Sequence, residues 1–156
     1  MATPTRFGSR TRQRGVAAVE MGLLLIPLVL MVFGTTELGR AIYSYNTLDK
    51  TVRDAARHLS QHGPGDTTVA AEARCLAVYG VDDCTGTPVA PGLTTAMVTI
   101  CDATLCPATH ANQPTGLGSV NLVTAGIQGY AYTSMVQFVV PNMTFNSIST
   151  TLRAQL

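Results

Sequence analysis

Charged residues are scarce in this sequence. Asp, Glu, Lys and Arg make up 12% of the 156 residues, where about 25% is usual for a soluble domain. The formal net charge is only +1, so the chain has no strong positive field with which to bind nucleic acid. Together with 46% hydrophobic residues, this composition favours one domain of modest size with an apolar anchor.

Motifs of the common enzyme classes are also missing. The sequence has no G-x-S-x-G, no P-loop and no G-x-G-x-x-G. His58 and His62 have the i, i+4 spacing of a helical metal pair but no third ligand, so we expect exposed histidines at a helix end. Asp82 and Asp83 are expected to form a turn rather than a calcium site. We therefore predict a protein that is not an enzyme, without cofactor or metal; an anchored hydrolase is the weakest alternative.

The few charges are distributed unevenly. No acid precedes Gly15, but four arginines do: Arg6, Arg10, Arg12 and Arg14. Acids outnumber bases in the rest of the chain. A basic segment before an apolar span and an acidic one after it predict that the N-terminus stays in the cytoplasm and the rest is exported. Residues 1–15 are polar and are expected to be a disordered cytoplasmic leader.

One long apolar run follows the leader. Residues 16–38 contain only two carboxylates, Glu20 and Glu37. As a helix this run would extend for about 35 Å, enough to cross a bilayer core of about 30 Å. Pro27 is expected to bend that helix. We expect Glu37, near the outer end of the run, to be a hydrated acid on the helix surface.

The helical pattern continues beyond the apolar run. Residues 39–62 carry an apolar stripe at steps of three and four, which predicts that the same helix goes on as an amphipathic half. The stripe consists of Leu38, Ile42, Tyr45, Leu48, Val52, Ala55 or Ala56, and Leu59. Gly63, Pro64 and Gly65 end it.

Residues 63–156 are expected to form a small domain that packs on this stripe. Asp66 or Thr67 begins a second helix that ends near Tyr79. Alternating, β-branched or aromatic sequence predicts strands at 96–101, 127–140 and 148–154, and 107–118 is predicted to be a long loop. Four aromatic residues are expected in the core or on a sheet face: Tyr130, Tyr132, Phe138 and Phe145. The fold class is α+β, a long N-terminal helix packed on a small antiparallel sheet with a second short helix.

All four cysteines lie in this domain. An even number of cysteines in an exported domain predicts two disulfides, and three pairings are open. We favour the two local ones, Cys75 with Cys84 and Cys101 with Cys106. The rival is a zinc site, which the lack of any C-x-x-C makes weak.

The apolar run fits three kinds of export signal. A cleaved secretory signal requires a small-x-small site after the run, and none is present. A plain signal anchor explains the span but leaves Glu20 unexplained, since a charge in the bilayer core costs about 2.5–3.5 kcal/mol. Cleavage before the run, after Gly15, would make Val16 the first residue and Glu20 the fifth. That arrangement resembles the type IV pilin-like signal.

The match extends through a longer pattern. Residues 14–20 read RGVAAVE, Pro27 follows within Leu-rich sequence, and then come FG at 33–34, ELGRA at 37–41 and AAR at 55–57. This pattern resembles the TadE-like family, the pilin-like proteins of tight-adherence (Flp) pili. Met21 departs from it, because the family usually has an aromatic residue after the glutamate. The length of the chain favours a minor pilin or pseudopilin over the short major pilin.

The resemblance implies a function. A prepilin peptidase would cut between Gly15 and Val16, where the missing side chain lets the leader approach a protease closely. Glu20 would then pair with the new amine of a neighbouring subunit. The implied partners are that peptidase, other pilin or pseudopilin subunits, the inner-membrane assembly machinery and lipid, and the implied role is pilus biogenesis and surface adhesion. The alternative is a single-pass anchored periplasmic binding or sensing domain without cleavage.

Small residues recur along the span and offer a further contact surface. Gly22, Gly34 and Gly39 would let another helix approach closely, but glycine is also common in membrane helices that have no such contact. The sequence leaves these two interpretations open.

Overall fold

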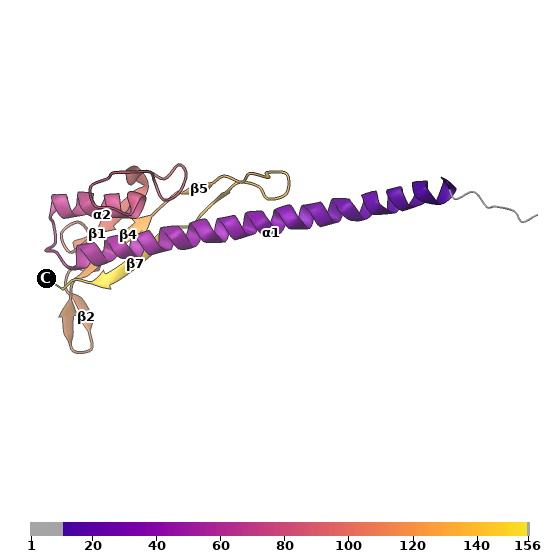
Figure 1. Ribbon diagram of the computed structural model, residues 1–156. Helices are drawn as coiled ribbons and strands as arrows, with labels where there is room; N and C mark the ends of the chain where they lie inside the picture. Colours follow the sequence, from indigo (N-terminus) through magenta and orange to yellow (C-terminus); the bar gives the residue numbers. More distant parts are fainter. Residues whose placement is uncertain (1–10, 156) are drawn as a thin grey trace, which may run out of the picture.

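One long helix organises the fold (Figure 1). The computed structural model describes residues 11–155, and the side chains of residues 15–155. Helix α1 runs from Thr11 to Ser60 and continues through Pro27 as one element. At 1.5 Å per residue it is about 75 Å long. The predicted continuous helix is confirmed, but residues 11–15, predicted to be disordered leader, already belong to it; residues 1–10 lie outside the described part.

Helix α2, Thr67–Tyr79, has the predicted bounds. The Asp66 carboxylate caps it by accepting hydrogen bonds from the backbone N–H groups of Thr68 and Val69, at 2.8 and 3.3 Å. Gly80 ends the helix with a φ of 77°, a left-handed conformation that glycine adopts without strain. α2 therefore starts and stops where its local sequence provides both caps.

Three antiparallel strands form the main sheet. The central strand β4 (Leu122–Ile127) lies between β1 (Val98–Cys101) and β7 (Ile148–Arg153), with a short 3-10 turn, Thr95–Met97, before β1. β1 and β7 confirm two predicted strands. The register places Ile127 opposite both Val98 and Ile148. Since side chains alternate along a strand, this register gathers the apolar residues on one face.

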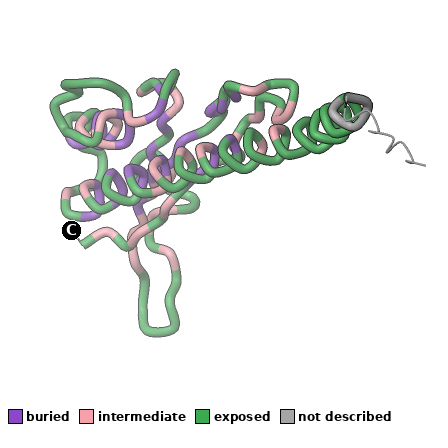
Figure 2. Tube along the Cα trace, turned by 45° about the vertical axis from the view of Figure 1, so that its right-hand side comes forward, coloured by how far each residue is buried: buried purple, intermediate pink, exposed green. Residues whose placement is uncertain are grey.

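Both helices cover that apolar face. Buried residues lie between the second half of α1, α2 and the sheet (Figure 2). Leu48 and Val52 of α1 are fully buried against this core, together with Ala73 and Ala77 of α2. The opposite face of the sheet presents exposed polar residues, including Thr99, Ser149 and Thr151. The domain is therefore a two-layer α+β structure, as predicted.

The apolar stripe on α1 is used over only part of its predicted length. From Leu48 to Leu59 its members are buried, as expected. Leu38, Ile42 and Tyr45 are exposed, which corrects the prediction for that part of the helix. At the same level of α1, Glu37 and Ala41 are buried, so the domain covers the adjacent face of the helix there and leaves this part of the stripe uncovered.

The prediction of a single strand over residues 127–140 is wrong. β4 ends at Ile127, and Gly129 turns the chain with a φ of 69°. Only Ala131–Tyr132 (β5) is extended and paired, with Met143–Thr144 (β6). Between them residues 133–142 form a loop closed by a turn, in which Val139 and Val140 both donate to the Val136 carbonyl, at 2.9 and 3.0 Å. The apolar alternation had suggested a half-buried strand, whereas Phe138, expected in the core, is 79% exposed.

The long loop predicted at 107–118 contains ordered structure. Pro107–His110 forms a short helix, α3, and Gln113–Thr115 (β2) pairs with Gly118–Val120 (β3) in a hairpin. Proline starts α3 at its first position, where no N–H is needed. The hairpin projects from the domain beside the C-terminal end of α1 (Figure 1).

Asp102 connects two loops of the domain through hydrogen bonds. Its carboxylate accepts backbone N–H bonds from Gly65, Thr104 and Leu105, at 2.9, 2.8 and 2.6 Å. Burial opposes the charge, but these bonds outweigh it and hold the pKa of Asp102 below its ordinary value. The residue thereby joins the loop after β1 to the α1–α2 connection.

An Asp102→Asn variant is expected to be less stable by about 1.5–3 kcal/mol at neutral pH, because its NH2 group cannot accept the Gly65 bond and its remaining oxygen is an uncharged acceptor. The lowered pKa gives this difference a pH dependence. The stabilisation is fully present above the unfolded-state pKa, about 3.9, and is lost as pH falls through the lower folded-state pKa. Urea unfolding of the full chain in detergent, at about pH 7 and about pH 2.5, should show the gap to wild type closing in acid. An exposed matched site, Asp82→Asn, should change little at either pH, and an equal gap for Asp102→Asn at both would contradict the prediction.

Candidate functional site

The first half of α1 carries a bare apolar surface. The large apolar side chains from Val16 to Phe33 are exposed, except that of Val29, which is half-buried. This half of α1 extends beyond the domain (Figures 1 and 2). α1 contains an 18-residue window with a mean hydropathy of 2.5, none of which is buried within the chain. By length and composition, α1 can cross a membrane.

The hydroxyl groups in this part of α1 are satisfied by the helix itself. Thr35 donates to the Met31 carbonyl at 2.9 Å, and Thr36 donates to the Val32 carbonyl at 2.8 Å. An unpaired polar group in hydrocarbon costs several kcal/mol. The two threonines are therefore compatible with an apolar environment, and the carboxylates remain to be explained.

Glu20 lies on the bare surface. Its side chain is exposed, and no side chain of residues 15–155 forms a hydrogen bond or ion pair with it. Val16 precedes it by four residues, about one helical turn. Within the part of the chain that the structure describes, Glu20 is thus the carboxylate of the apolar run that still needs a partner.

Gly15, the predicted cleavage position, lies inside helix α1. Apart from its chain neighbours and the backbone of its own helix, a Cβ at this position would meet no atom within 4 Å, so the space beside Gly15 is open. Glycine weakens a helix interior by about 1 kcal/mol relative to alanine, which favours local opening here. The side chains of Arg12 and Arg14, and all of Arg6 and Arg10, lie outside the described residues.

The environment of Glu37 differs from the sequence prediction more than that of any other site residue. Instead of a hydrated surface acid, it is 2% exposed and joins α1 to the domain. Its Oε1 accepts hydrogen bonds from the Tyr132 hydroxyl at 2.8 Å and from the Met135 backbone N–H at 3.1 Å. Arg40, one turn along α1, forms an ion pair with Oε2 at 3.0 Å. The carboxylate therefore fixes the start of loop 133–142 to α1.

The partners of Glu37 support one another. The Arg40 guanidinium lies 5.9 Å from the centre of the Tyr132 ring, within cation–π distance. Phe145 stacks on the Tyr132 ring, with the two ring centres 5.8 Å apart. Burial, and next the hydrogen bond to Glu37, raise the pKa of Tyr132 above its ordinary value, so its hydroxyl remains a donor at neutral pH. The i, i+3 spacing of Glu37 and Arg40 was visible in the sequence, but their contact with Tyr132 was not.

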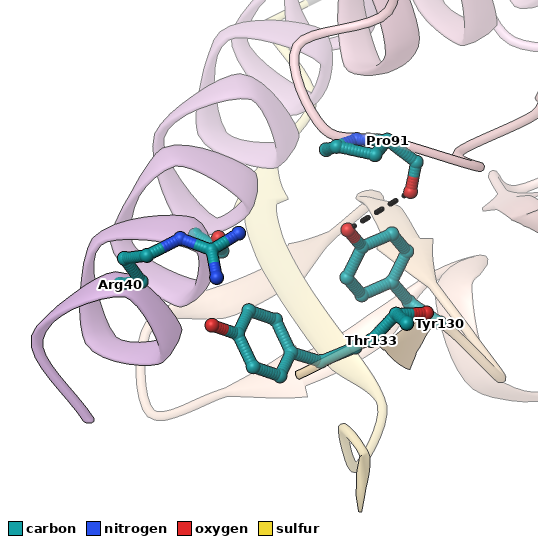
Figure 3. Close-up of a pocket in the computed structure, with 6 residues that line it drawn as sticks. Arg40, Pro91, Tyr130 and Thr133 are labelled. Atoms are coloured by element: carbon teal, nitrogen blue, oxygen red, sulfur yellow. Dashed lines mark hydrogen bonds between the residues drawn. The ribbon is translucent and has the colours of Figure 1, made fainter. Parts of the chain in front are cut away.

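A small cavity adjoins this cluster (Figure 3). Its volume is about 50 Å³, and its lining comprises Arg40, Ser44, Pro91, Tyr130, Tyr132 and Thr133. The Tyr130 hydroxyl donates to the Pro91 carbonyl at 3.1 Å across one side of it. One water takes about 30 Å³, whereas ligand sites usually measure about 300–1,000 Å³. The cavity is therefore too small to be a substrate site.

Both favoured disulfides are present. Cys75 pairs with Cys84 and Cys101 with Cys106, at Cα separations of 4.7 and 5.4 Å. His110 lies close enough to Cys101 and Cys106 to form a three-residue group of metal-ligand type. Zinc binds thiolates, however, and both sulfurs are used in the disulfide, so the rival zinc interpretation of these two cysteines is wrong.

His58 and His62 are half-buried instead of freely exposed, which corrects their prediction. His58 Nε2 lies 3.0 Å from a Glu72 carboxylate oxygen on α2, and His62 Nδ1 lies 2.7 Å from the His58 carbonyl. The first contact joins the end of α1 to the middle of α2, and the second lies within the C-terminal end of α1. A structural role accounts for both residues.

Comparison with known proteins adds one match. Residues 15–57, somewhat over a quarter of the chain, match the family described as TadE-like protein. No curated protein sequence and no solved structure is significantly similar to the chain. The resemblance noted in the sequence is thus confirmed for the part of α1 that carries the predicted cleavage position, Glu20 and Glu37.

Proposed function

We propose that this chain, whose residues 15–57 are TadE-like, is a pilin-like structural protein of a tight-adherence pilus system. A prepilin peptidase removes the leader after Gly15, and α1 anchors the protein in the cytoplasmic membrane with the disulfide-bonded domain outside. The protein then takes part in pilus biogenesis and adhesion as a minor pilin or pseudopilin, through contacts with other subunits and with the inner-membrane assembly machinery.

The observation that carries this proposal is the exposed Glu20 on a bare apolar helix. Such a surface needs lipid before assembly and other apolar helices after it. A carboxylate on it is costly unless it meets a positive group. Cleavage after Gly15 would create one, the α-amino group of Val16, which ordinarily titrates near 7.7–8.0 and is charged at neutral pH.

Helix geometry shows how the pair would set subunit register. Val16 and Glu20 are separated by about 6 Å along the axis. Two parallel copies offset by that distance bring the amine of one level with the carboxylate of the other. Because each charge is poorly solvated alone, other offsets are disfavoured, and the pair specifies register more than it adds stability.

We also propose that the protein is not an enzyme. The cavity beside Tyr132 is too small for a substrate, and His58 and His62 are used in contacts at the end of α1. The alternative function is a single-pass anchored binding or sensing domain with an uncleaved leader. That function would leave Glu20 without a use.

The N-terminus of the mature protein tests the proposal. Membrane-purified protein from cells with the prepilin peptidase should begin at Val16, and protein from cells without it should keep the leader. A Gly15→Leu variant should keep its leader in both strains, whereas Gly22→Leu, a glycine in the same helix with equal space around it, should be cut normally. A functional protein that retains its leader in peptidase-positive cells would favour the anchored binding domain.

A further inference from the structure

Loop 133–142 extends from the domain back along α1, toward its apolar half (Figure 1). Two contacts fix the position of the loop along the axis of α1. The Met135 N–H bonds to Glu37 at 3.1 Å, and a Val139 methyl group lies 3.5 Å from where a Cβ on Gly34 would be. Because 3.5 Å is an ordinary van der Waals separation, Val139 packs beside α1 at the level of Gly34.

The tip of this loop is apolar and exposed. Met135 and Phe138 are 78% and 79% exposed, and residues 133–142 contain no charged side chain. Ser134 makes two hydrogen bonds within the loop. Its N–H donates to the Asn142 side chain at 2.9 Å, and its hydroxyl accepts from the Val136 N–H at 3.1 Å. The loop therefore presents Met135 and Phe138 as ordered, exposed apolar side chains, with the polar Gln137 exposed between them.

The level of the tip matches the edge of a bilayer. Gly34 lies about 27 Å along the helix from Val16, and a bilayer core is about 30 Å thick. A membrane that covers the bare part of α1 would thus end beside the loop. Trp, Phe and similar side chains commonly lie at that boundary.

We infer that loop 133–142 inserts Met135 and Phe138 into the lipid headgroup region beside α1. Lipid is the occupant because the loop surface continues the apolar surface of α1 without a charged break. Two exposed side chains also offer far less than the roughly 800 Å² per partner that a stable protein interface buries. The inference rests on the membrane-anchoring part of the proposed function, but not on leader cleavage or pilus assembly.

Single tryptophans test this inference, because the chain has none of its own. Full-length Phe138→Trp is reconstituted into vesicles whose phosphatidylcholine carries bromine on its acyl chains near the headgroup, a short-range quencher of tryptophan. Leu25→Trp in the span is the positive control. Leu117→Trp, at the exposed tip of the β2–β3 hairpin, is the negative control.

The inference requires that Phe138→Trp be quenched at least about half as strongly as Leu25→Trp and emit at shorter wavelength than Leu117→Trp. Quenching of Leu25→Trp alone would overturn it and leave the anchor intact. Absence of quenching at all three positions would refute the anchor itself. Shielding of Phe138→Trp without bromine quenching would mean that a protein partner or second copy covers the loop, which also overturns it.

Discussion

A Glu20→Ala variant is expected to insert into the membrane and lose its leader normally, yet to be at least about tenfold less abundant in purified pili. Removing one partner of a buried charge pair costs about 3–5 kcal/mol, and tenfold corresponds to only about 1.4 kcal/mol. The variant would leave the Val16 amine of a neighbouring subunit without a charged partner in an apolar environment. Membrane content, N-terminal mass and the amount in sheared pili, measured on the same cells, separate insertion, cleavage and assembly.

Two matched variants make the Glu20 result specific. Glu20→Gln keeps the size of the side chain without its charge and should assemble as poorly as Glu20→Ala. Leu24→Ala removes apolar surface one turn further along the same exposed part of α1 and should assemble nearly normally. Wild-type incorporation of Glu20→Gln would mean that no ion pair forms, whereas equal defects in Glu20→Gln and Leu24→Ala would indicate a loss of general helix packing.

A Glu37→Ala variant is expected to release loop 133–142 from α1. It leaves the Tyr132 hydroxyl, the Met135 N–H and the Arg40 guanidinium without their shared acceptor. Hydrogen exchange at the Met135 amide should therefore accelerate by at least about tenfold, since a local opening has lost its main restraint. Peptides that cover β4 provide the internal reference, because their unchanged exchange shows that the sheet is still folded.

The effect should follow the number of bonds lost. Tyr132→Phe removes one donor and should accelerate exchange less than Glu37→Ala does. Arg53→Ala is the matched control, because it breaks another acid–base pair of α1, with Asp49. Arg53 is 67% exposed, and such surface pairs contribute about 0.2–1 kcal/mol, so this variant should leave exchange at Met135 unchanged. Unaltered exchange at Met135 in Glu37→Ala would show that Gly34 and Val139 hold the loop without the carboxylate.

Local signals in the sequence predicted the elements that they cap or cross-link. The bounds of α2 followed from Asp66 and Tyr79, and the short spacings favoured the two observed disulfides. The long helix followed from continuous periodicity. In each of these cases the determining residues lie within a few positions of the element, so no knowledge of distant packing is needed.

Prediction failed where distant contacts decide the structure. β4 is the central strand, and it was missed because Gly126 and small residues gave it a weak pattern; a Cβ at Gly126 would lie 3.1 Å from Ser149 Cβ on the neighbouring strand. The loop 133–142 was mistaken for a strand because exposure to lipid and burial in protein select the same apolar residues. Glu37 was misplaced for a related reason, since its partners Tyr132 and Met135 lie almost a hundred positions away.

The unbroken course of α1 has a mechanical consequence. The domain packs against α1 from about Glu37 onward. Pro27, the site where a helix bends most easily, lies before this packed part of the helix. The far end of α1 is about 50 Å beyond Pro27, so a bend of about 10° there would displace that end, together with the β2–β3 hairpin, by roughly 9 Å. A bend at this one position, inside the apolar segment, thus changes the orientation of the whole domain relative to the first part of α1.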